Sequence, residues 1–218
     1  MRIYIKGDYT KEIPFDYLEL AKRMWFENYQ GEGIPLSYSG FLQIRDRNAI
    51  AIHLKLDKQD YDERWLHVPI QEGIKYRFYS QIDEDINLEF ENAYVTDFRE
   101  NGDFLRLAST HLDLLTVDKR AMYIMAIEIA TAIDSQISED DKESWLSVEE
   151  FKNRHEDILS MSYEEANELS LEEIPFMDDV RDPVWEEDDR RNEEYIKIHG
   201  EPVYDDEEGE REPIILSI

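Results

Sequence analysis

The chain has 218 residues and no cysteine, and its 53 acidic and 24 basic residues give a net charge of −29. This composition excludes a disulfide framework and thiolate metal sites, and it argues against direct nucleic-acid binding, which needs cationic side chains for the phosphates. No apolar run reaches the roughly 20 residues that cross a bilayer, and the N-terminus lacks a signal-peptide pattern, so we expect a soluble, cytoplasmic protein without membrane contact.

The first 110 residues predict one helix and a β region. Residues 2–6 predict a strand, and Pro14 opens an amphipathic helix that ends at Gly31. In a later strand Ile86, Leu88 and Phe90 alternate with polar residues, which gives the strand one apolar face. That strand covers residues 86–95. Residues 41–45 and 49–57 are predicted to form a hairpin, and further strands are predicted at 65–70, 74–82 and 104–110.

The hydrophobic period becomes helical after residue 110. Residues 114–134 are apolar on most sides and predict a buried helix with Thr116 as its N-cap. Three further helices are predicted from signals at their N-terminal ends. Capping-box patterns start two of them, at Ser147 with Glu150 and at Ser162 with Glu165, and Asp182 followed by Pro183 starts the third. Gly200 ends the last helix, and the tail after it is expected to be irregular. Strands followed by helices predict an α+β fold, with an antiparallel sheet of about five to six strands covered on one face.

The charge divides the chain into two parts. Residues 1–138 contain 24 acidic and 16 basic residues, whereas residues 139–218 contain 29 acidic and 8 basic residues. We expect the first part to be a globular α+β body and the second to be an acidic, mainly helical region. Because no Gly/Ser-rich or Pro-rich linker separates them, we expect the two parts to pack together.

No catalytic or cofactor-binding motif is present. The P-loop, dinucleotide-binding, GxSxG and HExxH patterns are absent, and 8 glycines leave little material for a phosphate-binding loop. We therefore expect a protein that is not an enzyme and that uses no cofactor. His53 and His67 fall in predicted strands, and Asp57 or Asp113 offers a third ligand for a metal ion. Two half-buried histidines without a metal are the favoured interpretation.

The helix predicted from Pro183 is rich in carboxylates. Residues three and four apart lie about 5–6 Å apart on one helix face, so Glu186, Asp189 and Glu193 form one stripe. Duplex DNA advances about 3.4 Å along its axis for each charge of one strand, which agrees with the carboxylate spacing within about a factor of two. A protein that binds phosphates with Arg and Lys is therefore expected to accept this stripe. An acidic first turn that simply stabilises the helix is the alternative interpretation. The predicted partner-binding residues are Glu186, Glu187, Asp188, Asp189, Glu193, Glu194, Asp205, Asp206, Glu207 and Glu208.

In overall character the chain resembles the acidic inhibitors carried by phages and mobile elements, including antirestriction and anti-CRISPR proteins, some of which mimic DNA. The shared feature is acidic density, which is highest in residues 186–194 and 204–212. The resemblance implies a stoichiometric inhibitor whose partner is a basic protein. That partner is expected to be a nucleic-acid-binding enzyme such as a defence nuclease, or a CRISPR or restriction complex.

Residues 121–151 are similar to a pattern of bacterial toxin-immunity proteins. In that pattern an apolar helix leads to a short strand, an acidic turn, a tryptophan and another helix. The tryptophan here is Trp145, and Asp134 and Ser135 stand where the pattern has a glycine pair. This resemblance implies an inhibitor of a toxin. Two other interpretations stay open, namely an enzyme with a pocket away from the acidic region and a protein whose acidity serves only solubility.

Overall fold

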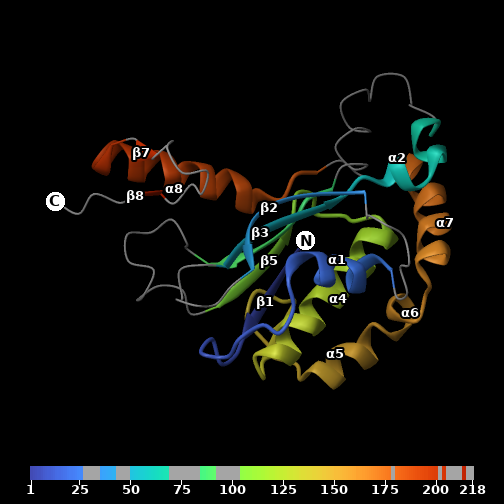
Figure 1. Ribbon diagram of the computed structural model, residues 1–218, viewed down its shortest axis with the longest axis horizontal. Coiled ribbons are helices and arrows are strands. Elements are labelled where there is room, and N and C mark those ends of the chain that lie inside the picture. The colour runs from blue at the N-terminus through green and yellow to red at the C-terminus, as the bar shows by residue number, and fades with distance from the viewer. Residues whose placement is uncertain are drawn as a thin grey trace.

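The computed structural model describes residues 1–26, 35–42, 50–68, 84–91, 104–177, 180–200, 203–204 and 213–214. At its centre is one antiparallel sheet of six strands in the order β2-β3-β4-β5-β1-β6, shown in Figure 1. The predicted α+β class is confirmed. The strands are β1 Arg2–Lys6, β2 Leu36–Leu42, β3 Ile50–Leu56, β4 Ile86–Phe90, β5 Leu105–Ser109 and β6 Gln136–Ser138.

Helices follow and connect the strands. A separate pair of two-residue strands, β7 Val203–Tyr204 and β8 Pro213–Ile214, lies in the tail that was expected to be irregular. No helix of the described residues is both long and apolar enough to cross a membrane. The helices are α1 Tyr17–Trp25, α2 Lys58–Tyr61, α4 Thr116–Ala132, α5 Val148–Arg154, α6 Glu156–Leu159, α7 Tyr163–Glu173 and α8 Pro183–His199, with 3-10 turns η1 Glu63–Leu66 and η2 Ile174–Phe176.

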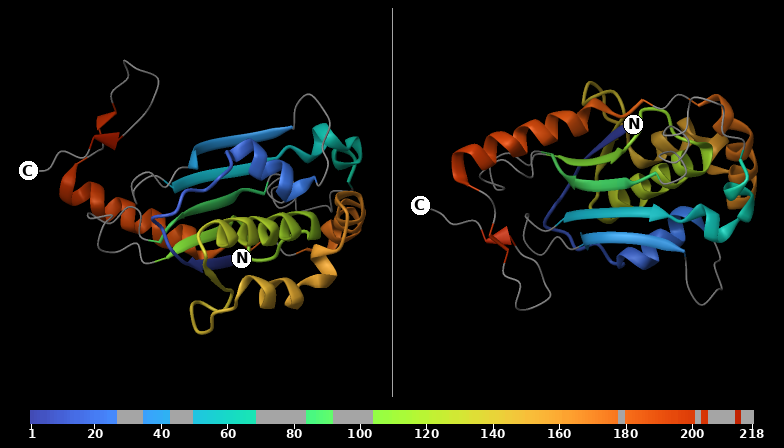
Figure 2. Two further views of the ribbon diagram at one scale, coloured as in Figure 1. Left: turned by 60° about the horizontal axis from the view of Figure 1, so that its bottom comes forward. Right: turned by 90° about the horizontal axis from the view of Figure 1, so that it is seen from above.

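The core lies between the sheet and α4. Of the 17 residues of α4, 12 are buried, which confirms the prediction of a buried helix. Leu88 of β4 and Leu107 of β5 point toward this helix from the sheet and are fully buried. Helices α1 and α7 pack against α4, so it is covered on several sides (Figure 2). The apolar face that the alternation in residues 86–90 predicts is therefore the face of the sheet that packs on α4.

Local sequence signals place most helix starts. Both predicted capping boxes are present, at Ser147 with Glu150 and at Ser162 with Glu165. The predicted N-cap of α4 is wrong by one residue, because Leu115 is the N-cap and Thr116 is the first helical residue. The side chain of Glu173 accepts hydrogen bonds from the Thr116 backbone N–H at 2.9 Å and from its hydroxyl at 2.7 Å. A long-range partner therefore takes the capping role at this end.

The limits of α1 and β2 also differ from the prediction. Helix α1 begins at Tyr17, because the Asp16 side chain accepts from the Glu19 backbone N–H, and it ends at Trp25. The predicted end, Gly31, lies outside the described residues. Strand β2 begins at Leu36, five residues before the predicted start, and pairs with β3 along its whole length.

The strand predicted at 65–70 is wrong over its described part, residues 65–68. Trp65 lies in the 3-10 turn η1, which starts where Asp62 accepts a hydrogen bond from the Arg64 backbone N–H. The Trp65 indole is buried and donates to Asn167 Oδ1 at 2.9 Å, so its apolar ring fills the core from a turn. The strand predicted at 74–82 lies outside the described residues.

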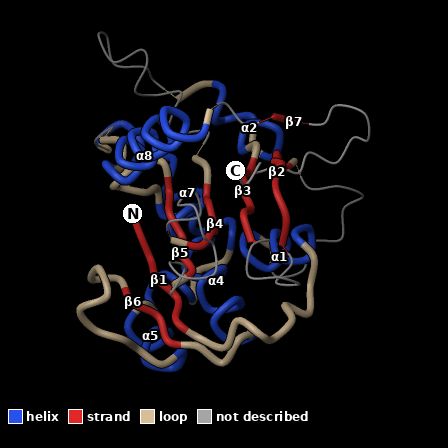
Figure 3. Tube along the Cα trace, turned by 90° about the vertical axis from the view of Figure 1, so that its left-hand side faces the viewer, coloured by secondary structure: helices blue, strands red, loops and turns tan. Residues whose placement is uncertain are grey.

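Helix α8 lies on the opposite side of the sheet from α1 and α4, as Figures 1 and 3 show. The prediction of a sheet covered on one face therefore needs a correction. On the second face Asn87, Glu89 and Arg106 are each only 3–4% exposed. Strands β4 and β5 are thus buried on both faces of the sheet, with polar residues on the face toward α8, and the contacts of α8 explain part of that burial.

Candidate functional site

The first residues of α8 are fixed to the sheet by a buried carboxylate. Asp182, the N-cap, has no exposed surface and accepts from the Val184 backbone N–H at 3.0 Å. Its Oδ2 lies 3.3 Å from the Arg2 Nε and 3.3 Å from the N-terminal ammonium of Met1. The Asp182 backbone N–H donates to the carbonyl of Thr110 at 2.9 Å. This end of the helix therefore has ionic and backbone bonds to β1 and to the end of β5.

A second anchor is the indole of Trp185. Its Nε1–H donates to the carbonyl of Ser109, the last residue of β5, at 2.9 Å. The guanidinium of Arg106 lies 5.8 Å from the centre of the indole ring, within the range of cation–π attraction. Val184 beside it is buried. The hydrogen bond fixes the orientation of the indole against the end of β5.

The third anchor is a buried cluster of one guanidinium and two carboxylates. Arg106 stands directly opposite Glu89 in the β4–β5 register and bonds to it. The same guanidinium lies 2.5 Å from Asp188 Oδ2 of α8. Burial alone lowers the pKa of Arg106, but the hydrogen bond with Asp188 and the charges of Glu89 and Asp188 outweigh it, so the pKa is raised. Asp188 thus faces the sheet, and its carboxylate is engaged inside the molecule.

The other predicted carboxylates of α8 face solvent. We call this exposed set the α8 carboxylate face, and its members are Glu186, Glu187, Asp189, Glu193 and Glu194. Four ion pairs moderate its charge, namely Glu187 with Arg191, Glu194 with Arg190, Glu193 with Lys197 and Asp189 with Arg181. Exposed pairs of this kind stabilise a protein by about 0–1 kcal/mol, so these carboxylates can exchange partners at low cost.

The α8 carboxylate face is displayed on a projecting helix. The 17 residues of α8 give it a length of about 25 Å. Both views of Figure 2 show its C-terminal half running beyond the sheet. Ile198, near that end, is 75% exposed. The remaining predicted partner-binding residues, Asp205, Asp206, Glu207 and Glu208, lie outside the described residues.

His53 and His67 do not lie as the alternative of a metal site between two strands requires. His53 is in β3, where it stands opposite Asn87, whereas His67 follows the 3-10 turn η1 and is not in a strand. His111 is buried, and its Nδ1 lies 2.5 Å from Glu84 Oε2. Among the residues that the structure describes, no three His, Cys, Asp or Glu side chains are grouped so that they could hold a metal ion.

Sequence reasoning missed one buried ion pair near these histidines. Lys58 Nζ lies 2.8 Å from Asp118 Oδ2, and both side chains are almost fully buried. Burial raises the pKa of Asp118 to about 6, against the opposing effect of Lys58. Asp118 is an ordinary acidic residue in the first turn of a helix, so no local pattern distinguishes it.

The chain is not matched by any protein-family model, by any curated protein or by any solved structure in three separate comparisons. The described geometry contains an anchored, projecting acidic helix. This arrangement can attract and hold cationic surfaces, because a dense set of like charges on a fixed scaffold sets up a strong local field.

Proposed function

We propose that this protein is a stoichiometric inhibitor that binds the basic nucleic-acid-binding surface of a defence nuclease or of a CRISPR or restriction complex. The α8 carboxylate face is the observation that carries the proposal. It combines five exposed carboxylates on one helix with a buried attachment of that helix to the sheet.

Pre-organisation of the helix supports the proposal. Binding costs free energy for every segment that must be ordered, and the anchors at Asp182, Trp185 and Asp188 remove part of that cost. Carboxylates about 5–6 Å apart along a helix face can meet Arg and Lys side chains that are arranged for a duplex, in which each strand carries one phosphate for about every 3.4 Å of helix axis. Mimicry of DNA is the mode of inhibition that this arrangement favours. The proposal requires no catalysis and no cofactor.

Capture from a bacterial lysate tests the proposal. The tagged full-length chain is incubated with lysate at low salt and eluted with moderate salt, and the eluate is identified by mass spectrometry. We expect one basic nuclease, restriction or CRISPR component that salt releases and that added DNA displaces, because charge pairing is screened by salt. Recovery of only scattered basic proteins, such as ribosomal ones, would contradict a specific inhibitor.

A second candidate function is an immunity protein that neutralises a bacterial toxin. Supporting it, α4 leads into the short strand β6, a turn, Trp145 and then α5, which is the order of elements in the resemblance. Ile137 of β6 is bridged to Leu146, and the Trp145 ring stacks on Phe104 at 5.3 Å. Co-expression with secreted toxin domains tests this candidate. Rescue of growth against one such toxin, together with a stable complex, would favour it over the first proposal.

A further inference from the structure

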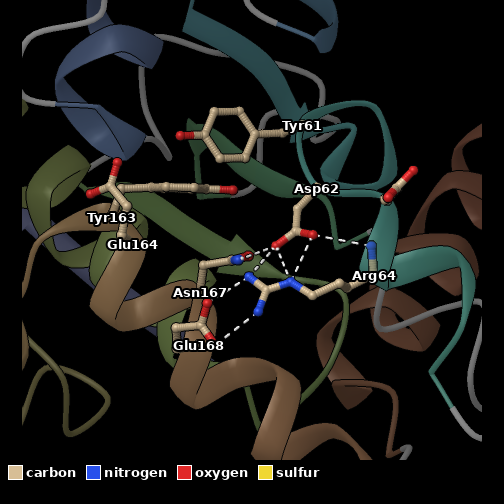
Figure 4. Close-up of a pocket in the computed structure, with 8 residues that line it drawn as sticks. Tyr61, Asp62, Arg64, Tyr163, Glu164, Asn167 and Glu168 are labelled. Carbon is tan, nitrogen blue, oxygen red and sulfur yellow. Dashed lines mark hydrogen bonds and ion pairs between the residues drawn. The ribbon is translucent and has the colours of Figure 1, made fainter.

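A pocket opens where α2 and η1 meet α7, at the end of the molecule away from the projecting half of α8 (Figure 1). Its volume is about 310 Å³, which lies at the lower end of the range for small-ligand sites. Figure 4 shows the side chains that line it. They are Tyr61, Asp62, Glu63, Arg64, Tyr163, Glu164, Asn167 and Glu168.

Two aromatic rings form one side of the pocket. The rings of Tyr61 and Tyr163 lie 4.5 Å apart at an angle of 77°, so the edge of one meets the face of the other. Phe26 supports both, with its ring centre 4.6 Å from Tyr163 and 5.0 Å from Tyr61. Tyr61 is 38% exposed and lines the pocket at the surface of the molecule. Ring faces of this kind attract cations.

The charges on the other side also select a cation. Four carboxylates and one guanidinium line the pocket. The guanidinium of Arg64 lies 2.6 Å from Asp62 and 2.6 Å from Glu168, so its charge is already matched. Hydrogen bonds from Arg64 lower the pKa of Asp62 to about 2, and Asp62 is ionised at neutral pH. The exposed carboxylates of Glu63 and Glu164 remain as excess negative charge, which would repel an anion.

The hydroxyl of Tyr163 adds a polar group without a partner. Tyr163 is only 4% exposed, and its hydroxyl is buried with no hydrogen-bond partner among the described residues. In Figure 4 the Tyr163 ring lies below Tyr61, and its hydroxyl points toward the space beside Asp62. Buried polar groups are nearly always hydrogen-bonded. A ligand N–H donated to this oxygen would supply the missing bond.

We infer that this pocket binds the guanidinium group of an arginine side chain presented by a partner protein. The guanidinium packs on the Tyr61 ring and donates to the Tyr163 hydroxyl, and the Glu63 and Glu164 carboxylates that line the pocket add the negative charge that attracts it. Arginine is favoured over lysine because a planar guanidinium stacks on aromatic rings and donates in several directions. The inference uses none of the α8 residues and goes beyond the proposed function.

Calorimetric titration of the full-length chain with short capped peptides tests the inference. We expect saturable binding of a Gly-Arg-Gly peptide, weaker binding of Gly-Lys-Gly, and no binding of Gly-Glu-Gly or inorganic sulfate. Free arginine is titrated as a second source of the same group. Tighter binding of free arginine than of the capped peptide would overturn the assignment to a partner's side chain, and absence of saturable binding by the Gly-Arg-Gly peptide would overturn the site.

Three pocket variants and one matched control make the test specific. We expect Tyr61→Leu to weaken the arginine peptide about tenfold, and Glu164→Gln to weaken it about threefold. Tyr163→Phe keeps the ring but removes the hydroxyl, and should weaken binding without lowering the melting temperature. Glu172→Gln, an exposed residue of the same helix outside the pocket, should bind as wild type. Unchanged affinity in Glu164→Gln and Tyr163→Phe would refute the assignment, even if Tyr61→Leu fails to fold.

Discussion

Asp188 and Glu194 belong to the same helix but differ in what they contact. Asp188 is paired with the buried Arg106, whereas Glu194 is exposed and paired with Arg190. Asp188→Asn should therefore lower the free energy of unfolding by about 1–3 kcal/mol, because a buried cation loses one of its two counter-charges. Glu194→Gln should change it by no more than about 0.5 kcal/mol. Urea denaturation of both variants measures the difference, and equal effects would show that Arg106 does not anchor α8.

Asp62 gives a pH dependence whose sign follows from its lowered pKa. Hydrogen bonds from Arg64 bring the pKa down from 3.8 to about 2, so the folded state binds the ionised form more strongly than the unfolded state does. The resulting stability is present above pH 4 and is lost as the pH falls toward 2. Wild type should exceed Asp62→Asn in free energy of unfolding at pH 7. Urea titrations at several pH values should find that this difference shrinks below pH 4, and a constant difference would contradict the argument.

Residue-level contacts over long sequence distances could not be predicted from the sequence. Thr116 with Glu173 and Arg106 with Asp188 join residues 57 and 82 positions apart, and nothing in their local sequence selects these partners. One local signal does exist for Asp188. It lies four residues after the buried Val184 and three after Trp185, so it shares the inward face of the helix.

Elements with local signals were predicted well. The capping boxes that start α5 and α7 need only residues three positions apart, and both are present. The alternation in β4 also predicts its core-facing side correctly. The strand prediction for residues 65–68 is wrong because the first two of these residues lie in a 3-10 turn, from which the buried Trp65 donates a hydrogen bond to Asn167 of α7. A short apolar run does not distinguish a buried strand from a buried turn.

Gly40 is required by the hairpin of β2 and β3. Its φ is +93°, and a Cβ at this position would lie 1.8 Å from the Ala51 carbonyl oxygen of the neighbouring strand. Gly40→Ala should therefore cost at least about 2 kcal/mol of unfolding free energy, since both the backbone and the partner strand must shift. Gly200, at the end of α8, is the matched control, because it has φ +85° but nothing within 4 Å of such a Cβ. Gly200→Ala should cost only about 1 kcal/mol, and thermal melts that rank the two variants in reverse would contradict the account.

At the scale of the whole molecule, the acidic region and the body share a core. Phe151 of α5 and Tyr163 of α7 belong to the same buried cluster as Ile129 of α4. The charge density of the sequence changes at residue 138, and described residues on both sides of that position belong to this one cluster. Charge is a surface property and does not report on packing. Over the described part of residues 139–177, exposed carboxylates of α5, α6 and α7 therefore lie on elements that pack on an ordinary apolar core.

The pocket beside α7 is a second feature that the sequence alone could not predict. It is lined by residues of two segments about 100 positions apart in the chain, 61–64 and 163–168. Each segment alone has the composition of an acidic surface with one aromatic residue. Their role as one site follows only from the fold, which places Tyr61 against Tyr163.

The central claim is that the α8 carboxylate face binds a basic partner, and a comparison of two variants in lysate capture tests it most directly. In one variant Glu186, Glu187, Asp189, Glu193 and Glu194 are replaced by Gln or Asn. The matched control has the same change in net charge at exposed carboxylates elsewhere, which are Glu143, Glu149, Glu156, Asp157 and Glu172. Loss of three i,i+4 pairs should cost the first variant only about 1 kcal/mol, so both should stay folded.

The measurement is the amount of the DNA-displaceable basic protein that each form retains at low salt. Wild type and the control variant should retain it, and the α8 variant should not. Equal retention by the α8 variant and wild type would contradict the claim that this helix face is the binding surface.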